Sequence, residues 1–186
     1  MSAAALPRVR FTREDVNQMT DAGLFADRRF ELIDGDLIDK MGQKPPHAEA
    51  IELLLDLLFE AFGPRRVRVQ APLEVSDADQ KYNFPEPDLS VRAQPRARGS
   101  KRLPCSHEMM LVVEVADTTL SSDLTIKRDL YARAGVPEYW VLNMKGRKLI
   151  VHRDPKDGKY ASTTTLTSRD TVSIAGQSIR IADMLP

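Results

Sequence analysis

The chain has 186 residues, of which 42% are hydrophobic and 29% are charged, which predicts one globular domain over residues 1–186. Its 27 basic and 27 acidic side chains cancel, so any nucleic-acid binding must depend on local patches. A single cysteine excludes an intrachain disulfide and a cysteine-rich zinc site. No apolar run is long enough to span a membrane and no apolar leader opens the sequence, so we expect a cytoplasmic protein with oxygen ligands for any metal.

The N-terminal half predicts a helix, a hairpin and a long second helix. Thr12 and Asp15 form a capping signal for a helix that continues to about Gly23. The segment FELIDGDLI alternates around Asp34 and Gly35, which is typical of a tight β-hairpin. Residues 47–62 form the longest predicted helix, with a stripe of acids expected in solvent and a broad apolar face. Short strands are expected at residues 67–70, 73–75 and 88–91.

The C-terminal half predicts more strands and a shorter helix. MMLVVEV, residues 109–115, has the length and valine content of a buried central strand. A helix is expected from residues 121–123 to the Gly-Val-Pro sequence at 135–137. EYWVLN and KLIVHR are interpreted as hairpin partners, and KYASTTTL, TVSI and SIRIADML as further short strands. Strand–helix–strand order implies a parallel pair and the hairpins imply antiparallel pairs, so we expect an α/β fold with a mixed central sheet flanked by helices.

Two carboxylates stand at the ends of predicted apolar strands. Glu114 lies near the end of the 109–115 strand, and Asp88 stands at the head of a second apolar strand, in PEPDLSV. An ionised carboxylate on a buried strand is unfavourable unless a cation meets it, and two in one pocket raise each other's pKa. A divalent metal would resolve both problems, since carboxylates are hard oxygen ligands. The alternative for Asp88 alone is an ordinary turn or strand-end aspartate.

Lys127 lies on the predicted helix that follows Glu114. At about 100° per residue, Lys127 falls in the middle of the apolar arc of this helix. The arc is formed by Leu124, Ile126, Leu130, Tyr131 and Ala134. We infer that the ammonium group faces the two acids. The alternative is a lysine that packs its aliphatic stem and extends its charge to water.

Three further polar residues carry weaker signals. Glu31 alternates with Phe30 and Leu32 in the predicted hairpin, and it is either a site residue or a solvated hairpin residue. His47, at the start of the long helix, is interpreted as a surface or near-cap histidine. Asp123 is interpreted as a first-turn residue at a helix N-terminus.

Residues 92–104 form a predicted loop with Pro, Gly and Ser, five basic residues and no acid. The loop follows the Asp88 strand directly, so we predict that it contacts phosphates, with a solvated flexible loop as the alternative. The five basic residues are Arg92, Arg96, Arg98, Lys101 and Arg102. A smaller second basic cluster is formed by Arg65, Arg66 and Arg68.

Together these segments resemble the Uma family of restriction endonucleases, a branch of the PD-(D/E)XK nuclease superfamily. The resemblance covers most of the chain and is most specific in LVVEVADTTLSSDLTIKRDLYARAGVPEYWVLN, where an acid, a lysine and a Gly-Val-Pro-Glu-Tyr-Trp turn have the family spacing. It implies that Asp88 and Glu114 are metal-binding acids, Lys127 the catalytic lysine and Glu31 an accessory acid. Where the superfamily motif has a lysine two residues after the second acid, this chain has Ala116. The Uma-like pattern moves that lysine to the following helix.

The resemblance implies a restriction-endonuclease-like domain that hydrolyses DNA phosphodiester bonds with Mg²⁺, or with Mn²⁺ as its substitute. In this interpretation Asp88, Glu114 and the Val115 carbonyl hold the metal, and Lys127 orients a water and stabilises negative charge. Glu31 adds a ligand or accepts a hydrogen bond from a metal-bound water. We expect DNA as the partner and a homodimer as the oligomer. Two alternatives stay open: a non-catalytic DNA-binding or assembly module on the same fold, and a metal-dependent hydrolase of RNA or a nucleotide.

Overall fold

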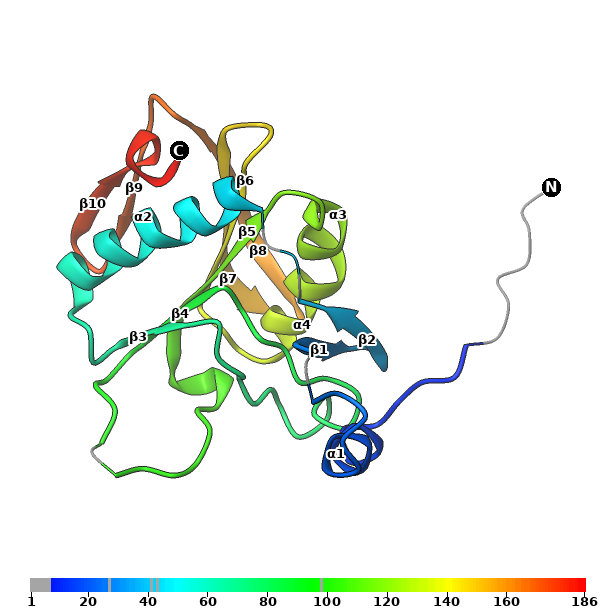
Figure 1. Ribbon diagram of the computed structural model, residues 1–186. Helices are drawn as coiled ribbons and strands as arrows, with labels where there is room; N and C mark the ends of the chain where they lie inside the picture. The colour runs from blue at the N-terminus through cyan, green and yellow to red at the C-terminus, as the bar shows by residue number, and fades with distance from the viewer. Residues whose placement is uncertain (1–7, 27, 41, 43, 98) are drawn as a thin grey trace.

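A six-stranded mixed sheet runs through the centre of the molecule (Figure 1). The structure, a computed structural model, describes residues 8–186 apart from positions 27, 41, 43 and 98. The sheet consists of β3 (Val67–Val69), β4 (Leu89–Arg92), β5 (Met109–Ala116), β6 (Glu138–Asn143), β7 (Lys148–Lys156) and β8 (Lys159–Thr167), in that spatial order. β5 and β6 are parallel, whereas the other neighbouring pairs are antiparallel. The expected α/β fold with a mixed central sheet is confirmed.

Strand β5 is buried on both faces, as its apolar sequence predicts. Val113 and Val115 belong to the hydrophobic cluster on one face of the sheet, and Val112 and Ala116 to the cluster on the other. Successive side chains of a strand point to opposite faces. Glu114 therefore shares the face of Val112 and Ala116.

Helix α2 (Pro45–Phe62) covers the first of these faces and crosses in front of the sheet in Figure 1. Leu54 and Leu58 are fully buried in the same cluster as Val113. The four acids expected in solvent are exposed on the outer side of the helix: Glu49, Glu52, Asp56 and Glu60. Neither α2 nor any other helix in the described residues is long and apolar enough to cross a membrane.

The opposite face is covered by one helical segment in three parts, α3 (Leu120–Ser122), the π-helical η2 (Asp123–Lys127) and α4 (Arg128–Arg133). Tyr131 is fully buried against this face, as the apolar arc predicts. The prediction for Ile126 is wrong, because its side chain is 49% exposed. A π-helix closes its hydrogen bonds over one more residue than an α-helix, so the angular spacing assumed for an α-helix does not hold here.

The N-terminal elements pack beside the sheet and are not part of it. Thr12 caps α1 (Arg13–Asp21) through the expected capping box with Asp15. β1 (Phe30–Ile33) and β2 (Asp36–Asp39) form the predicted hairpin as a separate two-stranded sheet. At its turn Asp34 and Gly35 have φ values of 50° and 82°, the positive values that a tight hairpin turn requires. A Cβ atom at Gly35 would lie only 2.7 Å from the Cβ of Arg10.

Two predicted strands are wrong. Residues 73–75 form no strand, because the Leu73 amide bonds to the Pro85 carbonyl and the Glu74 amide to the Pro104 carbonyl. The Ser106 N–H returns a bond to the Glu74 carbonyl, but the pairing is only an isolated parallel bridge between Glu74 and Cys105. In the last predicted strand, residues 181–184 instead form the 3₁₀ turn η3 (Ile181–Met184), with Ile181 and Met184 buried on one side. The remaining elements are η1 (Ser106–Glu108) and the hairpin of β9 (Thr171–Ile174) and β10 (Gln177–Arg180).

Candidate active site

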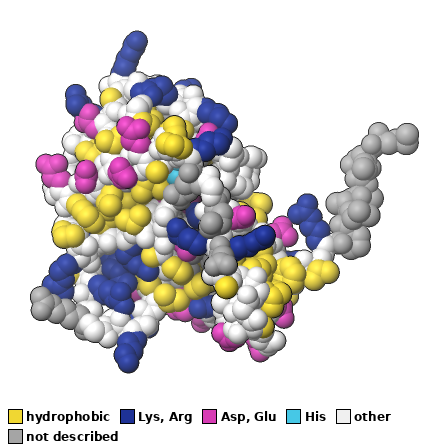
Figure 2. All heavy atoms as spheres, in the orientation of Figure 1, with side chains coloured by type: hydrophobic (Ala, Val, Ile, Leu, Met, Phe, Trp, Pro, Cys, Tyr) yellow, Lys and Arg dark blue, Asp and Glu magenta, His cyan; other side chains and the backbone are white. Residues whose placement is uncertain are grey.

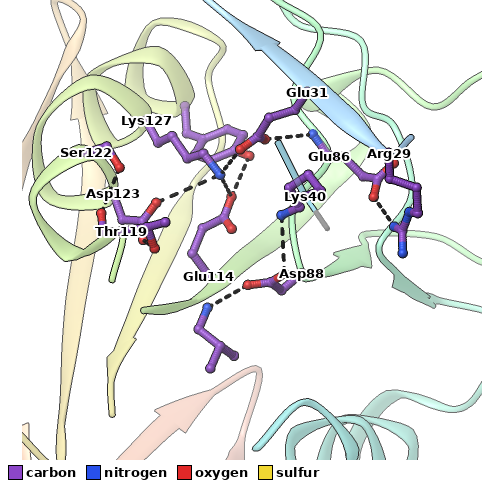
Figure 3. Close-up of polar contacts among 12 residues, drawn as sticks. Arg29, Glu31, Lys40, Glu86, Asp88, Glu114, Thr119, Ser122, Asp123 and Lys127 are labelled. Carbon is purple, nitrogen blue, oxygen red and sulfur yellow. Dashed lines mark hydrogen bonds and ion pairs between the residues drawn. The ribbon is translucent and has the colours of Figure 1, made fainter. Parts of the chain in front are cut away.

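Four charged side chains from separate segments meet in one pocket beside β4 and β5 (Figure 3). Glu31 comes from β1, Asp88 precedes β4, Glu114 lies in β5 and Lys127 ends η2. Each of the four residues is at most 5% exposed. The pocket, called the acid pocket below, has a volume of about 140 Å³ and is lined by all four residues. The sequence-predicted acids and lysine are thus brought together.

The Lys127 ammonium group is the centre of an ion cluster. Its Nζ lies 2.7 Å from Glu31 Oε1, 3.0 Å from Glu114 Oε1 and 3.8 Å from Asp123 Oδ1. Burial alone would lower the pKa of Lys127, but the surrounding carboxylates raise it well above its ordinary value. The side chain is only 6% exposed, so the alternative of an ammonium extended to water does not hold.

Glu114 is contacted by two donors at one oxygen. The Tyr131 hydroxyl donates a hydrogen bond to Oε1 at 3.1 Å, and the Lys127 ammonium donates to the same oxygen at 3.0 Å. Burial raises the pKa of Glu114 above its ordinary value, and the nearby Lys127 and Lys40 offset only part of that effect. Any further cation in the pocket would therefore stabilise the ionised form of Glu114.

Asp88 is held in ionised form on the other side of the pocket. Its Oδ2 accepts a hydrogen bond from the Val115 N–H at 2.9 Å. Its Oδ1 lies 3.4 Å from Lys40 Nζ and 3.7 Å from His47 Nε2. Burial alone would raise the pKa of Asp88, but His47, Lys40 and the Val115 N–H together lower it well below its ordinary value. The two pocket acids thus have pKa shifts of opposite sign.

Lys40 and His47 are the site residues that the sequence analysis did not find. The ammonium group that contacts Asp88 belongs to Lys40, which directly follows β2, and not to Lys127. His47 lies near the cap of α2, as one half of its interpretation expects, but it is not a surface histidine, because its side chain is 15% exposed and lines the acid pocket. α2 begins at Pro45, and His47 in its first turn places the start of this helix beside Asp88. No periodic pattern in the sequence marks either contact.

Asp123 also belongs to the Lys127 cluster. It begins η2, as its predicted place at a helix start implies, but it is only 1% exposed. Its Oδ2 accepts a hydrogen bond from the Thr119 hydroxyl at 2.5 Å. The four-residue spacing from Asp123 to Lys127 is a sequence signal that could have identified this pair.

The pocket offers oxygen donors for a metal. In the described part of the chain, no group of three or more His, Cys, Asp and Glu side chains is placed to hold a metal ion. The predicted ligands Asp88 and Glu114 line the pocket with Val115, and Glu31 is a further carboxylate in the same pocket. The N–H and C=O of one strand residue point to the same neighbouring strand, so the Val115 carbonyl shares the side of Asp88. This set fits Mg²⁺ or Mn²⁺, since Mg²⁺ usually takes one or two carboxylates and keeps several waters.

The described basic residues of the loop after β4 do not line the acid pocket. Arg92 and Arg96 line a second pocket, and Lys101 is exposed. Arg102 is paired through two guanidinium nitrogens with Glu108. Arg98, also predicted to contact phosphate, lies outside the described residues. The structure thus separates the described arginines of this set into one arginine in an ion pair, Arg102, and two that share a different pocket, Arg92 and Arg96.

The fold is shared with a solved protein of Anabaena variabilis ATCC 29413, described as "a putative nuclease belonging to DUF820". The two structures match with a TM-score of 0.66 at 14% identity, over 86% of this chain and 91% of that chain. At this identity the match shows a common fold, a mixed α/β fold found in a nuclease-type protein. No curated protein sequence matches the chain.

Residues 13–181 match the model of the Uma2 family, whose description is "Putative restriction endonuclease". The match covers most of the chain, and the protein therefore belongs to the Uma2 family. The expected family is confirmed, and with it a nuclease-type role.

Proposed function

We propose that this protein is a divalent-metal-dependent endonuclease that hydrolyses phosphodiester bonds in DNA. One observation carries the proposal: Glu31, Asp88, Glu114 and Lys127 converge in one buried pocket although they come from four segments. A buried ion pair often stabilises the folded protein less than apolar residues of similar size would. Perturbed acids and a lysine gathered in a pocket are typical of a catalytic site. The Uma2 family description supports the nuclease class.

Asp88, Glu114 and the Val115 carbonyl would hold the metal. When bound, Mg²⁺ or Mn²⁺ lowers the pKa of a coordinated water and neutralises charge on the attacked phosphate. The Val115 N–H fixes the orientation of the Asp88 carboxylate. The Tyr131 hydroxyl does the same for Glu114. Both acids are thus held in place before a ligand arrives, as preorganised catalysis requires.

Lys127 acts by its charge. Because neighbouring carboxylates raise its pKa, it is a poor proton donor and stays protonated at neutral pH. Its ammonium group would orient the attacking water and stabilise the negative charge that develops on the phosphate. Glu31 positions Lys127 through one oxygen, at 2.7 Å, and accepts a hydrogen bond from the Glu86 amide through the other.

The test is cleavage of supercoiled plasmid DNA with Mg²⁺, with Mn²⁺ and with a chelator. We expect cleavage only with a divalent metal, and loss of both cleavage and calorimetric Mn²⁺ binding in Asp88→Asn. The matched control is Asp56→Asn, because Asp56 is an exposed acid of α2. DNA binding without cleavage under all conditions would contradict catalysis and favour the non-catalytic module. Cleavage of RNA or a nucleotide but not DNA would contradict the substrate.

A further inference from the structure

A second pocket lies at the other end of β4 and is lined by arginines. Arg68 comes from β3, Arg92 is the last residue of β4, and Arg96 follows in the loop. With Arg65, these residues line what we call the arginine pocket, which has a volume of about 530 Å³. Lysine and arginine side chains gather over this region at the lower left of Figure 2.

The positive charge of the arginine pocket has no acidic partner within it. None of the described residues that line it is Asp or Glu. Arg68 donates a hydrogen bond to the Pro72 carbonyl at 3.0 Å, and Arg96 donates to the Ser100 carbonyl. Burial, together with Arg92 and Arg96, lowers the pKa of Arg68 to about 10. The three guanidinium groups thus repel one another, and arginine cannot relieve this by losing its proton at neutral pH.

Arg92 is the residue of this pocket that points most directly to an anionic ligand. The residue is only 8% exposed, and its buried Nε has no hydrogen-bond partner among the described residues. Glu108 is the acid that acts on Arg92, but its two carboxylate oxygens are bonded by Arg102. A buried donor on a charged group is strongly unfavourable when it is left unpaired. An anion in the pocket would bring acceptor oxygens to the Arg92 guanidinium group.

We propose that the arginine pocket binds a phosphate group of a nucleic-acid strand whose scissile phosphate lies in the acid pocket. The guanidinium fork matches the geometry of phosphate oxygens, which carry the acceptors that Arg92 lacks. The inference rests on the proposed function, since it places both pockets on one strand. Asp88 and Arg92 are four residues apart, about 13 Å along an extended chain. Since successive phosphates of a strand advance by only about 3.4 Å along a B-DNA axis, the two pockets are far enough apart to take different phosphates.

The test begins with calorimetric titration of inorganic phosphate into the wild-type protein, with sodium chloride at matched ionic strength as reference. We expect single-site binding that Arg92→Gln weakens at least about tenfold, because charged hydrogen bonds are lost. Arg96→Gln, an exposed loop change, is the second variant in case Arg92→Gln does not fold. The matched control is Arg180→Gln, because that arginine is exposed and paired with Asp183. Unchanged phosphate binding in both pocket variants would overturn the site.

A second measurement separates a nucleic-acid phosphate from free phosphate. We expect duplex DNA affinity at fixed salt to fall in the same variants, by at least about tenfold. Arginine-dependent phosphate binding with unchanged DNA affinity would overturn the nucleic-acid assignment. Asp88→Asn should lose metal binding and keep phosphate binding. Failure of the proposed hydrolysis would therefore show at the acid pocket, and failure of this inference at the arginine pocket.

Discussion

The acid pocket and the arginine pocket lie at opposite ends of β4 and differ in whether their buried charges have partners of opposite sign. In the acid pocket, Lys127 lies within 3.0 Å of both Glu31 and Glu114, and Lys40 lies 3.4 Å from Asp88. In the arginine pocket, no described lining residue is acidic. A buried charge is tolerated when a partner meets it and is strongly unfavourable when none does. The first region thus carries its own counter-ions, whereas the second is completed by an anion from outside.

The largest effect is expected for Lys127→Met, which removes the cation that pairs with Glu31 and Glu114 in the acid pocket. Methionine keeps an unbranched stem of similar length without the charge, so the fold should be kept although Glu31 and Glu114 lose their cation. Removing one partner of a buried ion pair should lower the free energy of unfolding by about 3–5 kcal/mol at neutral pH. Cleavage should fall at least about a hundredfold, the scale for losing one electrostatic stabiliser. Urea unfolding and plasmid cleavage measure the two effects.

The control for this change is Lys159→Met, which removes an exposed lysine paired with Asp129. A double variant with Glu114→Gln should recover part of the lost stability, because it removes an acid left without its cation. A folded Lys127→Met protein with an unchanged cleavage rate would show that the lysine only packs.

The next largest effect concerns His152, a buried base that can lose its proton, unlike the arginines of the arginine pocket. His152 is 2% exposed, stacks on Tyr139 and Tyr160, and has a buried Nε2 without a hydrogen-bond partner among the described residues. Burial, with Arg128, lowers the pKa of His152 to about 4, from an ordinary 6.5. The unfolded chain therefore binds the proton more readily, and stability should be lost as pH falls from 6.5 towards 4, by about 3 kcal/mol.

Thermal or urea unfolding across this pH range measures the loss. His152→Phe should flatten the pH dependence, because phenylalanine keeps the ring contacts and cannot titrate. His107→Gln, which alters an exposed histidine, should leave it unchanged. An equally steep loss of stability in His152→Phe would assign the dependence to other groups.

Lys40→Met should sharpen the comparison by removing one internal cation from the acid pocket. The Lys40 ammonium group and a bound metal ion repel each other. Two like charges about 4 Å apart repel by about 4 kcal/mol at an effective dielectric constant of about 20, and movement of the lysine side chain relieves part of this repulsion. Mn²⁺ affinity should therefore rise by about tenfold, measured by calorimetry without nucleic acid. The control is Lys148→Met, an exposed lysine at the start of β7. Weaker Mn²⁺ binding in Lys40→Met would mean that Lys40 supports the metal site.

The smallest effect concerns the basic loop beside the arginine pocket. Each lost phosphate contact should reduce the slope of log DNA affinity against log salt by about one, because fewer counterions are released. The variant Arg96→Ala/Arg98→Ala/Lys101→Ala should show this in binding measured over a range of salt. Arg102→Ala should change the slope less, since its guanidinium is already paired with Glu108. Coincident slopes for the triple variant and the wild type would show that the loop is only solvated.

Much of the fold could be predicted because local patterns and global contacts agree. The capping box at Thr12, the Asp34-Gly35 turn and the apolar run of β5 each specify local structure that the packing keeps. Residues 73–75 could not be predicted, since their backbone bonds go to segments that follow only later in the chain. The separate sheet of β1 and β2 is likewise decided by packing and not by the hairpin sequence.

The candidate site could be predicted where a charge interrupts an apolar pattern. This signal exists for Glu114 on β5 and for Lys127 on the helical segment. It is absent for Lys40 and His47, which reach Asp88 only through tertiary structure across long stretches of chain. Contacts of this kind depend on where a hairpin end and a helix start are placed in space, which no local spacing encodes.

Because η2 is a π-helical turn, this region should tolerate residue substitutions but not insertions or deletions. Thr125 and Ile126 are exposed within it, so substitution there should be mild. Deleting Thr125 or Ile126 would give the segment α-helical spacing. It would also rotate α3 and Asp123 by about 100° relative to α4. Asp123 could then no longer face Lys127, which stays in place with Tyr131. In a lineage of related sequences, single-residue insertions and deletions should therefore be rarer here than substitutions, although the surface is open to solvent.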